Sequence, residues 1–396
     1  MANTDRPSPN GQLIAFTSTR LILSTAYRMV FPFLAVFGRG LGVGLETVSF
    51  VIGVRSAMGL AGPVFGAFAD TRTRRQAMLV GLALFVAGMA LVSAFPTLLF
   101  FSAGLILSGV GNIIADSAIY AYIGDHVPYV QRGRAIAIIE IGWSAAFLVG
   151  IPVVGWLITR HGWYAPFPFL AGLGLTVALW LGRILPRSEN SVKRQRSAWR
   201  SLHLIRTHST AIFGLLVTFL LLAANQCINI IYGAWMETTH GLRAAQLGAA
   251  SAVIGAAGIG GVALAATVSD RIGKRRAIAL GVGVNTIVCL ALPVFEEQLP
   301  AALSGLFLFY LSFEFALVSS IPLMTQLVPA ARATLMAANV AAIAAGDAVG
   351  AFIGPYLFRM GFGTNALVVA SLNLAALFLL LWRVRVSGSV HQPRNP

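Results

Sequence analysis

Long apolar runs follow one another along nearly the whole chain of 396 residues, and they constrain the fold more than any single motif. Each run has about 20 residues, the length an α-helix needs to cross about 30 Å of hydrocarbon. Hydrophobic residues make up 57% of the sequence and charged residues 10%, whereas a soluble domain has about 25% charged residues. The sequence therefore predicts an all-α membrane protein without a sizeable soluble domain.

The apolar runs divide the chain into about twelve predicted spans. They cover residues 15–37, 46–69, 77–95, 98–121, 134–158, 165–184, 210–235, 246–268, 277–294, 300–326, 333–357 and 364–383. With the N-terminus placed in the cytoplasm, most basic residues fall in cytoplasmic segments. The exceptions are Arg39, Arg160, Arg243 and Arg359 in outer loops, and Arg28 and Arg55 inside spans. The positive-inside rule then predicts a cytoplasmic-membrane protein with both termini in the cytoplasm, and the net charge of +15 indicates topology rather than a nucleic-acid partner.

Two similar stretches of sequence lie 200 residues apart. In each, an apolar run ends at an aspartate, Asp70 or Asp270, and a basic cluster follows at once. Further pairs extend the repeat: Pro128 with Pro329, Arg134 with Arg332, and Arg160-His161-Gly162-Trp163 with Arg359-Met360-Gly361-Phe362. The sequence thus predicts two pseudo-symmetric six-helix bundles in parallel orientation, residues 1–186 and 210–396, joined by a basic cytoplasmic linker, residues 187–209.

These charged stretches resemble the hairpin motif of the major facilitator superfamily. The motif is matched at Gly66, Asp70, Arg74 and Arg75, and again at Asp270, Arg271, Gly273, Lys274 and Arg275. Thr73 and Ala266 stand where the family usually has glycine, and the stretch 125–134 resembles its connection between helices four and five. The resemblance covers essentially the whole chain. It implies a twelve-helix transporter in which helices 1, 4, 7 and 10 line a central cavity.

The resemblance also implies gating contacts at the cytoplasmic face. Asp70 would face the N-terminus of the eleventh helix, where unpaired N–H groups favour a carboxylate, and Arg74 would pair with Asp125. Asp270 would do the same for the fifth helix. The predicted gating residues are Gly66, Asp70, Arg74, Arg75, Asp125, Arg134, Glu140, Asp270, Arg271, Gly273 and Arg275. The alternative is that the basic residues only enforce topology.

Glycines and prolines in the fifth and eleventh spans resemble the pattern of the superfamily's antiporters. They are Gly142, Gly150, Pro152 and Gly155, and Gly346, Gly350, Gly354 and Pro355. Two features differ from drug–proton antiporters: Ile151 splits the expected Gly-Pro pair, and Leu105 stands where those proteins carry an arginine. The pattern favours export of a small organic compound.

Polar side chains recur at helical spacing on the spans that the resemblance places around the cavity. Ionisable groups near the bilayer centre are costly and usually face such a cavity. The predicted substrate-binding residues are Arg28, Asn112, Asp116, Asn225, Gln226, Asn229, Tyr232 and Glu314. The alternative is that the polar residues form hydrogen bonds between helices.

Three carboxylates inside spans are candidates for proton coupling: Asp116, Glu314 and Asp347. An unpaired carboxylate in low dielectric takes up a proton, whereas a nearby arginine holds it ionised. Permanent ion pairs with Arg28 or Arg55 would instead give structure without coupling. Asp347 fits a proton site and a partner of Arg55 equally well.

Together these patterns predict a secondary transporter that moves a small organic solute by alternating access, in the direction of proton-coupled efflux. Two alternatives stay open: a proton-coupled importer of an organic anion with Arg28 as the clamp, and a membrane sensor with the same fold. The sequence has no nucleotide-binding loop, hydrolase motif or metal-ligand spacing, so we predict no enzyme, cofactor or metal site. The expected partners are the solute, protons and the lipid bilayer, without nucleic acid, and the chain is expected to be a monomer.

Overall fold

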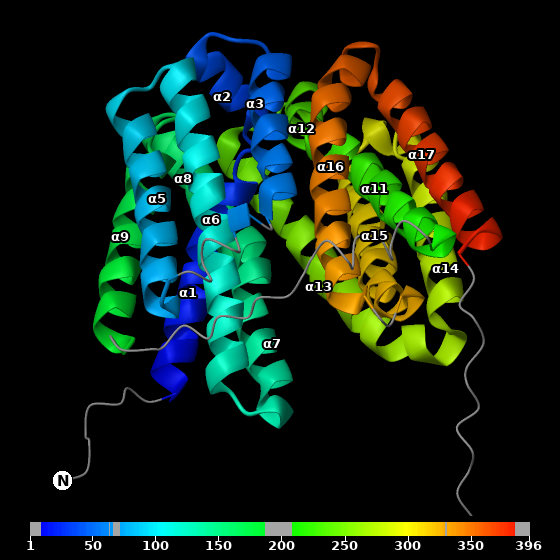
Figure 1. Cartoon of the computed structure of the whole chain (residues 1–396). Coiled ribbons are helices and arrows are strands. Elements are labelled where there is room, and N and C mark those ends of the chain that lie inside the picture. The colour runs from blue at the N-terminus through cyan, green and yellow to red at the C-terminus, as the bar shows by residue number, and fades with distance from the viewer. Residues whose placement is uncertain (1–8, 63, 66–71, 187–207, 329–330, 385–396) are drawn as a thin grey trace, which may run out of the picture.

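A computed structural model describes residues 9–62, 64–65, 72–186, 208–328 and 331–384, and its regular elements there are all helical. The helices form two bundles that stand side by side (Figure 1). The first contains α1 (Pro9–Arg28), α2 (Leu34–Leu41), α3 (Leu45–Ala57), the 3-10 turn η1 (Met58–Ala61), α5 (Arg74–Ala94), α6 (Leu98–His126), α7 (Tyr129–Ala145), the π-helical turn η2 (Ala146–Gly150), α8 (Ile151–His161) and α9 (Pro166–Ile184). The second contains α11 (Ser209–Asn229), α12 (Tyr232–His240), α13 (Ala244–Ile272), α14 (Lys274–Ala291), η3 (Val294–Glu297), α15 (Leu299–Leu327), α16 (Arg332–Arg359) and α17 (Phe362–Trp382).

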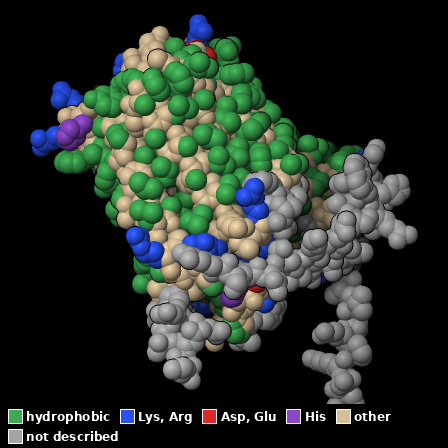
Figure 2. Space-filling view, turned by 60° about the vertical axis from the view of Figure 1, so that its left-hand side comes forward, with side chains coloured by type: hydrophobic (Ala, Val, Ile, Leu, Met, Phe, Trp, Pro, Cys, Tyr) green, Lys and Arg blue, Asp and Glu red, His purple; other side chains and the backbone are tan. Residues whose placement is uncertain are grey.

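The helices have the length and composition of a membrane protein. Within the described ranges, nine helices are long and apolar enough to cross a bilayer, or ten if Leu34–Leu41 and Leu45–Ala61, bent by 113°, count as one more. The bend between Leu41 and Leu45 coincides with the loop between the first and second predicted spans. Helix α14 is outside this set because its first three residues are basic, and α1 is outside it because its mean hydropathy is lowered by polar residues. Hydrophobic side chains are spread over the whole described surface in Figure 2, and charged side chains are few.

The two bundles repeat the same internal packing. Helix α1 packs on α7 and α9 as α11 packs on α16 and α17, and α5 packs on α6 and α9 as α14 packs on α15 and α17. The contacts between bundles are equivalent too, because α8 meets α13 and α16 meets α3. This is the arrangement that parallel repeats produce. Most of the linker 187–209 lies outside the described residues, and the division at 186 and 210 stays a prediction.

Glycines mark equivalent turns in the two bundles. Gly42 and Gly241 end α2 and α12 in the left-handed region, with φ of 69° and 66°, and each donates its N–H back into the last helical turn. Residues with a Cβ rarely adopt this conformation. At a third equivalent position the halves differ: Gly273 has φ 87°, whereas Thr73 is extended and forms a capping box with Gln76. The capping box explains how threonine replaces glycine at the start of α5.

The first and seventh predicted spans are each broken. Residues 29–33 separate α1 from α2, and residues 230–231 separate α11 from α12. The second interruption leaves Ser209–His240 long and apolar enough to count as one membrane span, in agreement with the predicted seventh span. Pro32 explains the first break, because it has no N–H and disfavours helical geometry in the preceding residue. The two interrupted segments are in contact, because Gly233 at the start of α12 packs on Pro32. A Cβ on Gly233 would lie 2.6 Å from Pro32 Cα.

One end of the molecule, here called the basic end, carries Arg74, Arg75, Lys274 and Arg275. Arg75 Nη2 donates to Gly182 O at 2.5 Å, and Arg275 Nε donates to Leu380 O at 3.3 Å. Both arginines thus satisfy carbonyls in the last turn of α9 or α17, which have no partner within their own helix.

A second pair of basic residues at this end also binds backbone carbonyls. Arg132 Nε donates to Val127 O at 2.8 Å, and Arg332 Nε donates to Thr325 O at 3.0 Å. Arg132 and Arg332 thus both bind a carbonyl at or near the end of the preceding helix, and the pairing of Arg134 with Arg332 stays a prediction.

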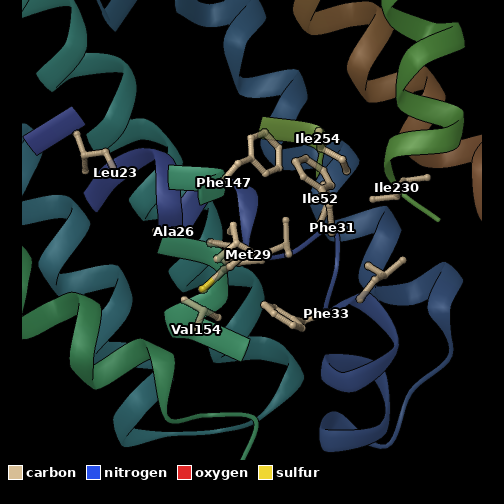
Figure 3. Packing of buried hydrophobic residues seen from close by; sticks show 14 of the residues in the cluster. Leu23, Ala26, Met29, Phe31, Phe33, Ile52, Phe147, Val154, Ile230 and Ile254 are labelled. Atoms are coloured by element: carbon tan, nitrogen blue, oxygen red, sulfur yellow. The ribbon is translucent and has the colours of Figure 1, made fainter. Parts of the chain in front are cut away.

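The other end, here called the opposite end, is where Gly42 and Gly241 lie and where the bundles meet. Arg39 pairs with Glu237 at 2.6 Å and Arg359 pairs with Glu46 at 3.3 Å, and both pairs cross between bundles. Below them Ser49 Oγ donates to Ala351 O. Buried side chains from both bundles continue the contact inward, among them Phe33, Val154, Ile230 and Ile254 (Figure 3). The bundles are therefore closed against each other from this end to about the middle.

Candidate binding site in the central cavity

A cavity of about 500 Å³ lies between the bundles. It starts at the level of the two helix breaks and extends towards the basic end, because its lining includes Arg20, Asp116 and Leu317. Eight of the predicted substrate-binding and proton-coupling residues line it: Arg28, Asn112, Asp116, Asn225, Gln226, Asn229, Glu314 and Asp347. The structure thus brings residues from α1, α6, α11, α15 and α16 to one space.

Tyr232 was also predicted to bind substrate, but it does not line this cavity. Its side chain is buried, and its hydroxyl forms a hydrogen bond of 2.9 Å with Ser251 Oγ. The prediction assumed a continuous helix from Asn225 onwards. The break at 230–231 ends that helical face, so Tyr232 begins a new helix and points into packing with α13.

Arg28 is the last residue of α1 and lies between two aromatic rings. Its guanidinium carbon is 3.6 Å from the ring centroid of Trp143 and 4.1 Å from that of Phe147. Only 9% of the residue is exposed. Within the described part of the chain Arg28 has no carboxylate within ion-pair distance, and its Nε has no hydrogen-bond partner. A buried guanidinium without an anion is costly, so this position is prepared for a negatively charged group.

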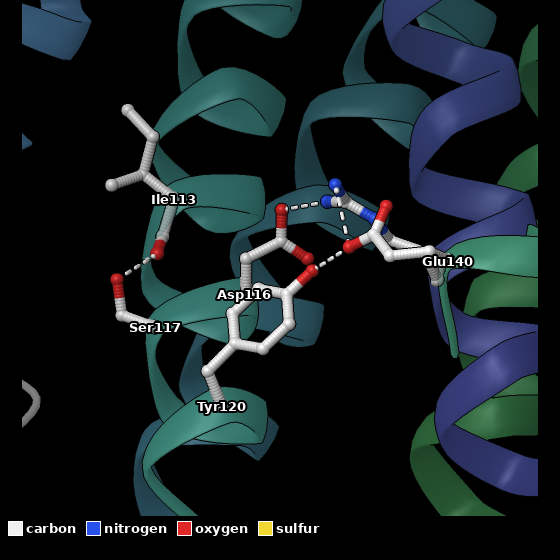
Figure 4. Close-up of polar contacts among 6 residues, drawn as sticks. Ile113, Asp116, Ser117, Tyr120 and Glu140 are labelled. Carbon is white, nitrogen blue, oxygen red and sulfur yellow. Dashed lines mark hydrogen bonds and ion pairs between the residues drawn. The ribbon is translucent and has the colours of Figure 1, made fainter. Parts of the chain in front are cut away.

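Arg20 lies on the same helix, two turns closer to the basic end, and is paired. It forms an ion pair with Asp116 and lies 3.6 Å from Glu140. Tyr120 donates its hydroxyl hydrogen to Glu140, so Asp116, Tyr120 and Glu140 converge (Figure 4). Asp116, a candidate for substrate binding and proton coupling, therefore has a cationic partner, which is Arg20 rather than Arg28 or Arg55.

Sequence reasoning missed Arg20. It lies inside the first predicted span, yet only Arg28 and Arg55 were assigned to spans. The signal was present in the spacing, since Arg20, Ser24 and Arg28 follow each other at intervals of four residues on one helix.

Arg55 makes a different contact from the one considered for it. Its Nη2 donates to Tyr27 O at 3.0 Å, and its guanidinium carbon lies 4.1 Å from the Tyr27 ring centroid. Gly109 leaves room for it, because a Cβ there would lie 2.9 Å from Arg55 Cγ. An ion pair between Arg55 and Asp347 is absent among the residues described, and Asp347 lines the cavity instead.

The second bundle supplies amides and a phenol. Asn229 Nδ2 donates to Gln226 Oε1 at 2.9 Å, and Tyr310 donates to Asn229 Oδ1 at 2.9 Å. Asn225 Oδ1 and Gln226 Nε2 are buried without a hydrogen-bond partner. These atoms offer a donor and an acceptor to a molecule in the cavity.

The sequence also did not identify Trp143 and Phe147, which line the cavity from the fifth span. They are four residues apart, and Phe147 lies in the π-helical turn η2. A π-helical turn of this kind often occurs at functional sites. The prediction considered polar and ionisable side chains only, whereas two aromatic rings on the fifth span hold the guanidinium.

Among the predicted gating residues that the structure describes, Arg74, Arg75 and Arg275 lie at the basic end, whereas Glu140 lies beside Arg20 of the cavity lining. The predicted pair is present, since Arg74 Nε lies 2.9 Å from Asp125 Oδ2. In the second bundle Lys274 pairs instead with Asp270, four residues before it, at 3.0 Å. Gly66 and Asp70 lie outside the described residues.

The other members of that set differ in their surroundings. Gly273 forms the turn before α14, and Arg134 lines a second cavity of about 470 Å³ with Tyr122 and His126. Arg75 and Arg275 bind helix ends as described above, and Glu140 contacts Tyr120. The gating roles of the whole set stay predictions.

Comparison with known proteins agrees with this architecture. The family model described as Major Facilitator Superfamily matches residues 16–355 and 214–396. The chain is 25% identical to the uncharacterized MFS-type transporter YceJ of Bacillus subtilis, over 80% of each chain. It is 22% identical to the sialic acid transporter NanX of Escherichia coli, over 72% of this chain and 71% of the relative. Among solved structures, a D-xylose–proton symporter superposes with a TM-score of 0.79 at 16% identity, covering 96% of this chain and 99% of that one.

Proposed function

Because the chain belongs to the major facilitator superfamily, whose members are multi-pass membrane transporters, we propose that it moves a small organic anion together with protons. The proposal rests on one observation above all. Arg28 is buried in the wall of the central cavity and lacks an anionic partner there.

The surroundings of Arg28 favour a carboxylate as its ligand. Trp143 and Phe147 stack on the guanidinium, so its N–H groups are available along the edge of the plane rather than above it. A guanidinium edge matches the two oxygens of a carboxylate, and a lysine could not form the same fork. One relative is named as a transporter of sialic acid, which is also an organic acid.

Glu314 offers a way to couple the anion to protons. It lines the cavity close enough to Arg28 for their charges to interact. When an anion binds Arg28, the guanidinium no longer offsets the charge of Glu314, and protonation of Glu314 becomes more favourable. Anion and proton then bind together and leave together, which is symport. The efflux predicted from the glycine–proline pattern would instead require solute and proton to compete.

The proposed orientation follows from the basic residues. The positive-inside rule places the basic end in the cytoplasm, so the closed opposite end would face outward and the cavity would be reached from the cytoplasm. The two bundles, residues 1–186 and 210–396, would rock about the cavity during transport. In this orientation an inward proton gradient drives import.

Flux measurements in proteoliposomes test the proposal. Purified protein is first screened with organic acids, amines and neutral compounds for thermal stabilisation, and the best ligands are then tested for uptake under an imposed pH gradient. We expect accumulation of an acid when the inside is alkaline. Accumulation of an amine when the inside is acidic would favour the efflux antiporter, and binding without flux would favour the sensor.

Two variants separate the roles of the site residues. Glu314→Gln is expected to retain exchange of labelled for unlabelled anion but to lose accumulation driven by the pH gradient. Arg28→Gln is expected to lose both. Arg183→Gln, which changes an exposed arginine at the end of α9, is the matched control and should behave as the wild type. Gradient-driven accumulation by Glu314→Gln would contradict its role in coupling.

A further inference from the structure

We propose that Arg20 is a second anion-binding group of the cavity, and that the preferred substrates are short dicarboxylates. This inference rests on the proposed function, in which Arg28 holds the first carboxylate. It assigns a binding role to a residue that is so far only the partner of Asp116 and Glu140.

The geometry of the two arginines supports this. Their guanidinium carbons lie 4.7 Å (Arg20) and 3.6 Å (Arg28) from a ring centroid of Trp143, so they are at most about 8 Å apart. Both residues line the same cavity. Two carboxylates bound to these guanidiniums fit a diacid with a backbone of about four to six carbons. A longer diacid would have to fold back on itself.

Arg20 is incompletely satisfied by its present partners. Its Nε and the Oδ1 atom of Asp116 are both buried without a hydrogen-bond partner. One guanidinium faces two carboxylates, those of Asp116 and Glu140, which leaves an excess of negative charge beside it. Protonation of Asp116 removes that excess and releases one side of Arg20 to the cavity, while Glu140 stays in place.

The charges balance in a simple way. A dianion brings two negative charges, and two carboxylates of the cavity each take up one proton. They are Asp116, which the dianion displaces from Arg20, and Glu314, whose charge Arg28 no longer offsets. The other groups that face Arg20 keep their state: Tyr120 on α6, and Glu140 and Trp143 on α7. The inference therefore requires two protons for each dianion and electroneutral transport.

A competing interpretation has the Arg20 cluster as a fixed structural ion pair. In that case a monocarboxylate would occupy Arg28 alone, with its apolar body against the aromatic residues of the lining. Matched probes distinguish the two interpretations, because a diacid and its half-amide have almost the same size and differ in one charge.

The first experiment compares succinate, glutarate and adipate with their half-amides on the purified full-length protein by calorimetry. We expect each diacid to bind at least about tenfold more tightly than its half-amide. Arg20→Gln should abolish that ratio and change half-amide binding less than about threefold. Arg183→Gln is the control and should keep the ratio.

Arg20→Gln leaves two carboxylates without a cation and could misfold for that reason, so a second variant tests the same role independently. Asp116→Asn has the same size and frees Arg20, so it should raise diacid affinity at pH 7 and lower the protons carried per diacid from two to one.

The outcomes have distinct meanings. Equal binding of diacid and half-amide by the wild type, or weaker diacid binding in Asp116→Asn, would overturn the role of Arg20 and leave Arg28 as the single anion group. Failure of every acid, including the half-amides, to bind would overturn the proposed function itself.

Discussion

The two walls of the cavity are built from equivalent helices but carry different chemistry. Trp143 and Phe147 in the first bundle correspond, 200 residues later, to Ile343 and Asp347 in the second, and all four line the cavity. Arg28 at the end of α1 has its counterpart in Asn229 at the end of α11. In the described part of the two bundles, arginines therefore line the cavity from the first bundle only, where aromatic rings hold them beside Asp116, whereas the second bundle offers amides and carboxylates without an arginine.

This difference separates the residues that determine the fold from the residues that determine binding. The repeat fixes the helix order, the turns at Gly42 and Gly241, and the helix breaks, because these decide whether two bundles can form and meet. It leaves the side chains at the cavity free to diverge. A ligand bound between the described walls then meets arginines on one side only, whereas carboxylates face it from both sides.

The largest expected effect comes from making the two walls alike. Arg28→Asn gives α1 the residue that α11 has, and it removes the guanidinium proposed to bind the anion. We expect a loss of about 2–5 kcal/mol in binding free energy, or about 30- to 4,000-fold in Kd. Calorimetry with the best acid from the screen measures it.

A swap extends this test. The double variant Arg28→Asn with Asn229→Arg moves the guanidinium to the other wall, where Ile343 and Asp347 replace the aromatic pair. We expect no recovery of affinity. Recovery would show that the walls are interchangeable, against the comparison drawn here.

The next effect concerns close packing at equivalent glycines. A Cβ on Gly350 would lie 2.6 Å from the backbone oxygen of Ala223, which cannot move aside, whereas a Cβ on Gly150 meets the side chain of Thr25. We expect Gly350→Ala to lower the free energy of unfolding by about 1–3 kcal/mol and Gly150→Ala by less. Thermal unfolding of the two variants in the same detergent shows which substitution lowers stability more. Equal losses would mean that both interfaces are equally rigid.

At the basic end, equivalent substitutions in the two bundles should have the same effect on stability. Arg75→Gln and Arg275→Gln each remove a charged hydrogen bond to the last turn of α9 or α17, so each should cost about 1–2 kcal/mol of stability. Chemical unfolding followed by tryptophan fluorescence measures both. A loss in only one variant would break the equivalence of these anchors.

The smallest effect is expected at the opposite end. The arginines of the pairs Arg39–Glu237 and Arg359–Glu46 have side chains that are 62% and 71% exposed, so each pair should contribute only about 0.2–1 kcal/mol. Glu46→Gln and Glu237→Gln together should therefore increase the population separated at this end by about two- to thirtyfold.

Spin labels report this population. Distances between labels at the exposed positions 160 and 243 are compared in the wild type and the double variant, without ligand. High salt should mimic the substitutions in the wild type and have little effect on the double variant, because salt screens exposed charges. A salt response of equal size in both proteins would assign the closure to other contacts.

The sequence was sufficient for the fold and for most of the polar residues that line the cavity, and its failures have physical causes. Apolar run length and the repeat depend on the bilayer and on chain duplication, so both can be recognised without coordinates. Tyr232 was misplaced because a polar stripe can be extrapolated along a helix only while the helix continues. Pro32 was a visible signal of a break, whereas the break at 230–231 has no comparable signal in its own residues.

The charged residues were harder to place, for a different reason. Which carboxylate meets which arginine depends on how neighbouring helices are rotated, and a single sequence does not contain that rotation. The sequence therefore identified Asp116 and Glu140 but not their shared partner Arg20. The pairing of Arg74 with Asp125 was anticipated because the resemblance carried information about helix neighbours.

The break after Arg28 has an electrical consequence. Peptide dipoles along α1 sum to roughly half a negative charge at its last turn, where carbonyls lack partners within the helix. Since Arg28 is the last residue of α1, its positive charge sits in the potential of its own helix end. That potential lowers the energy of an unliganded guanidinium without occupying its hydrogen-bond donors. Rather than trapping its cargo, the site would then hold it loosely enough for release within each cycle.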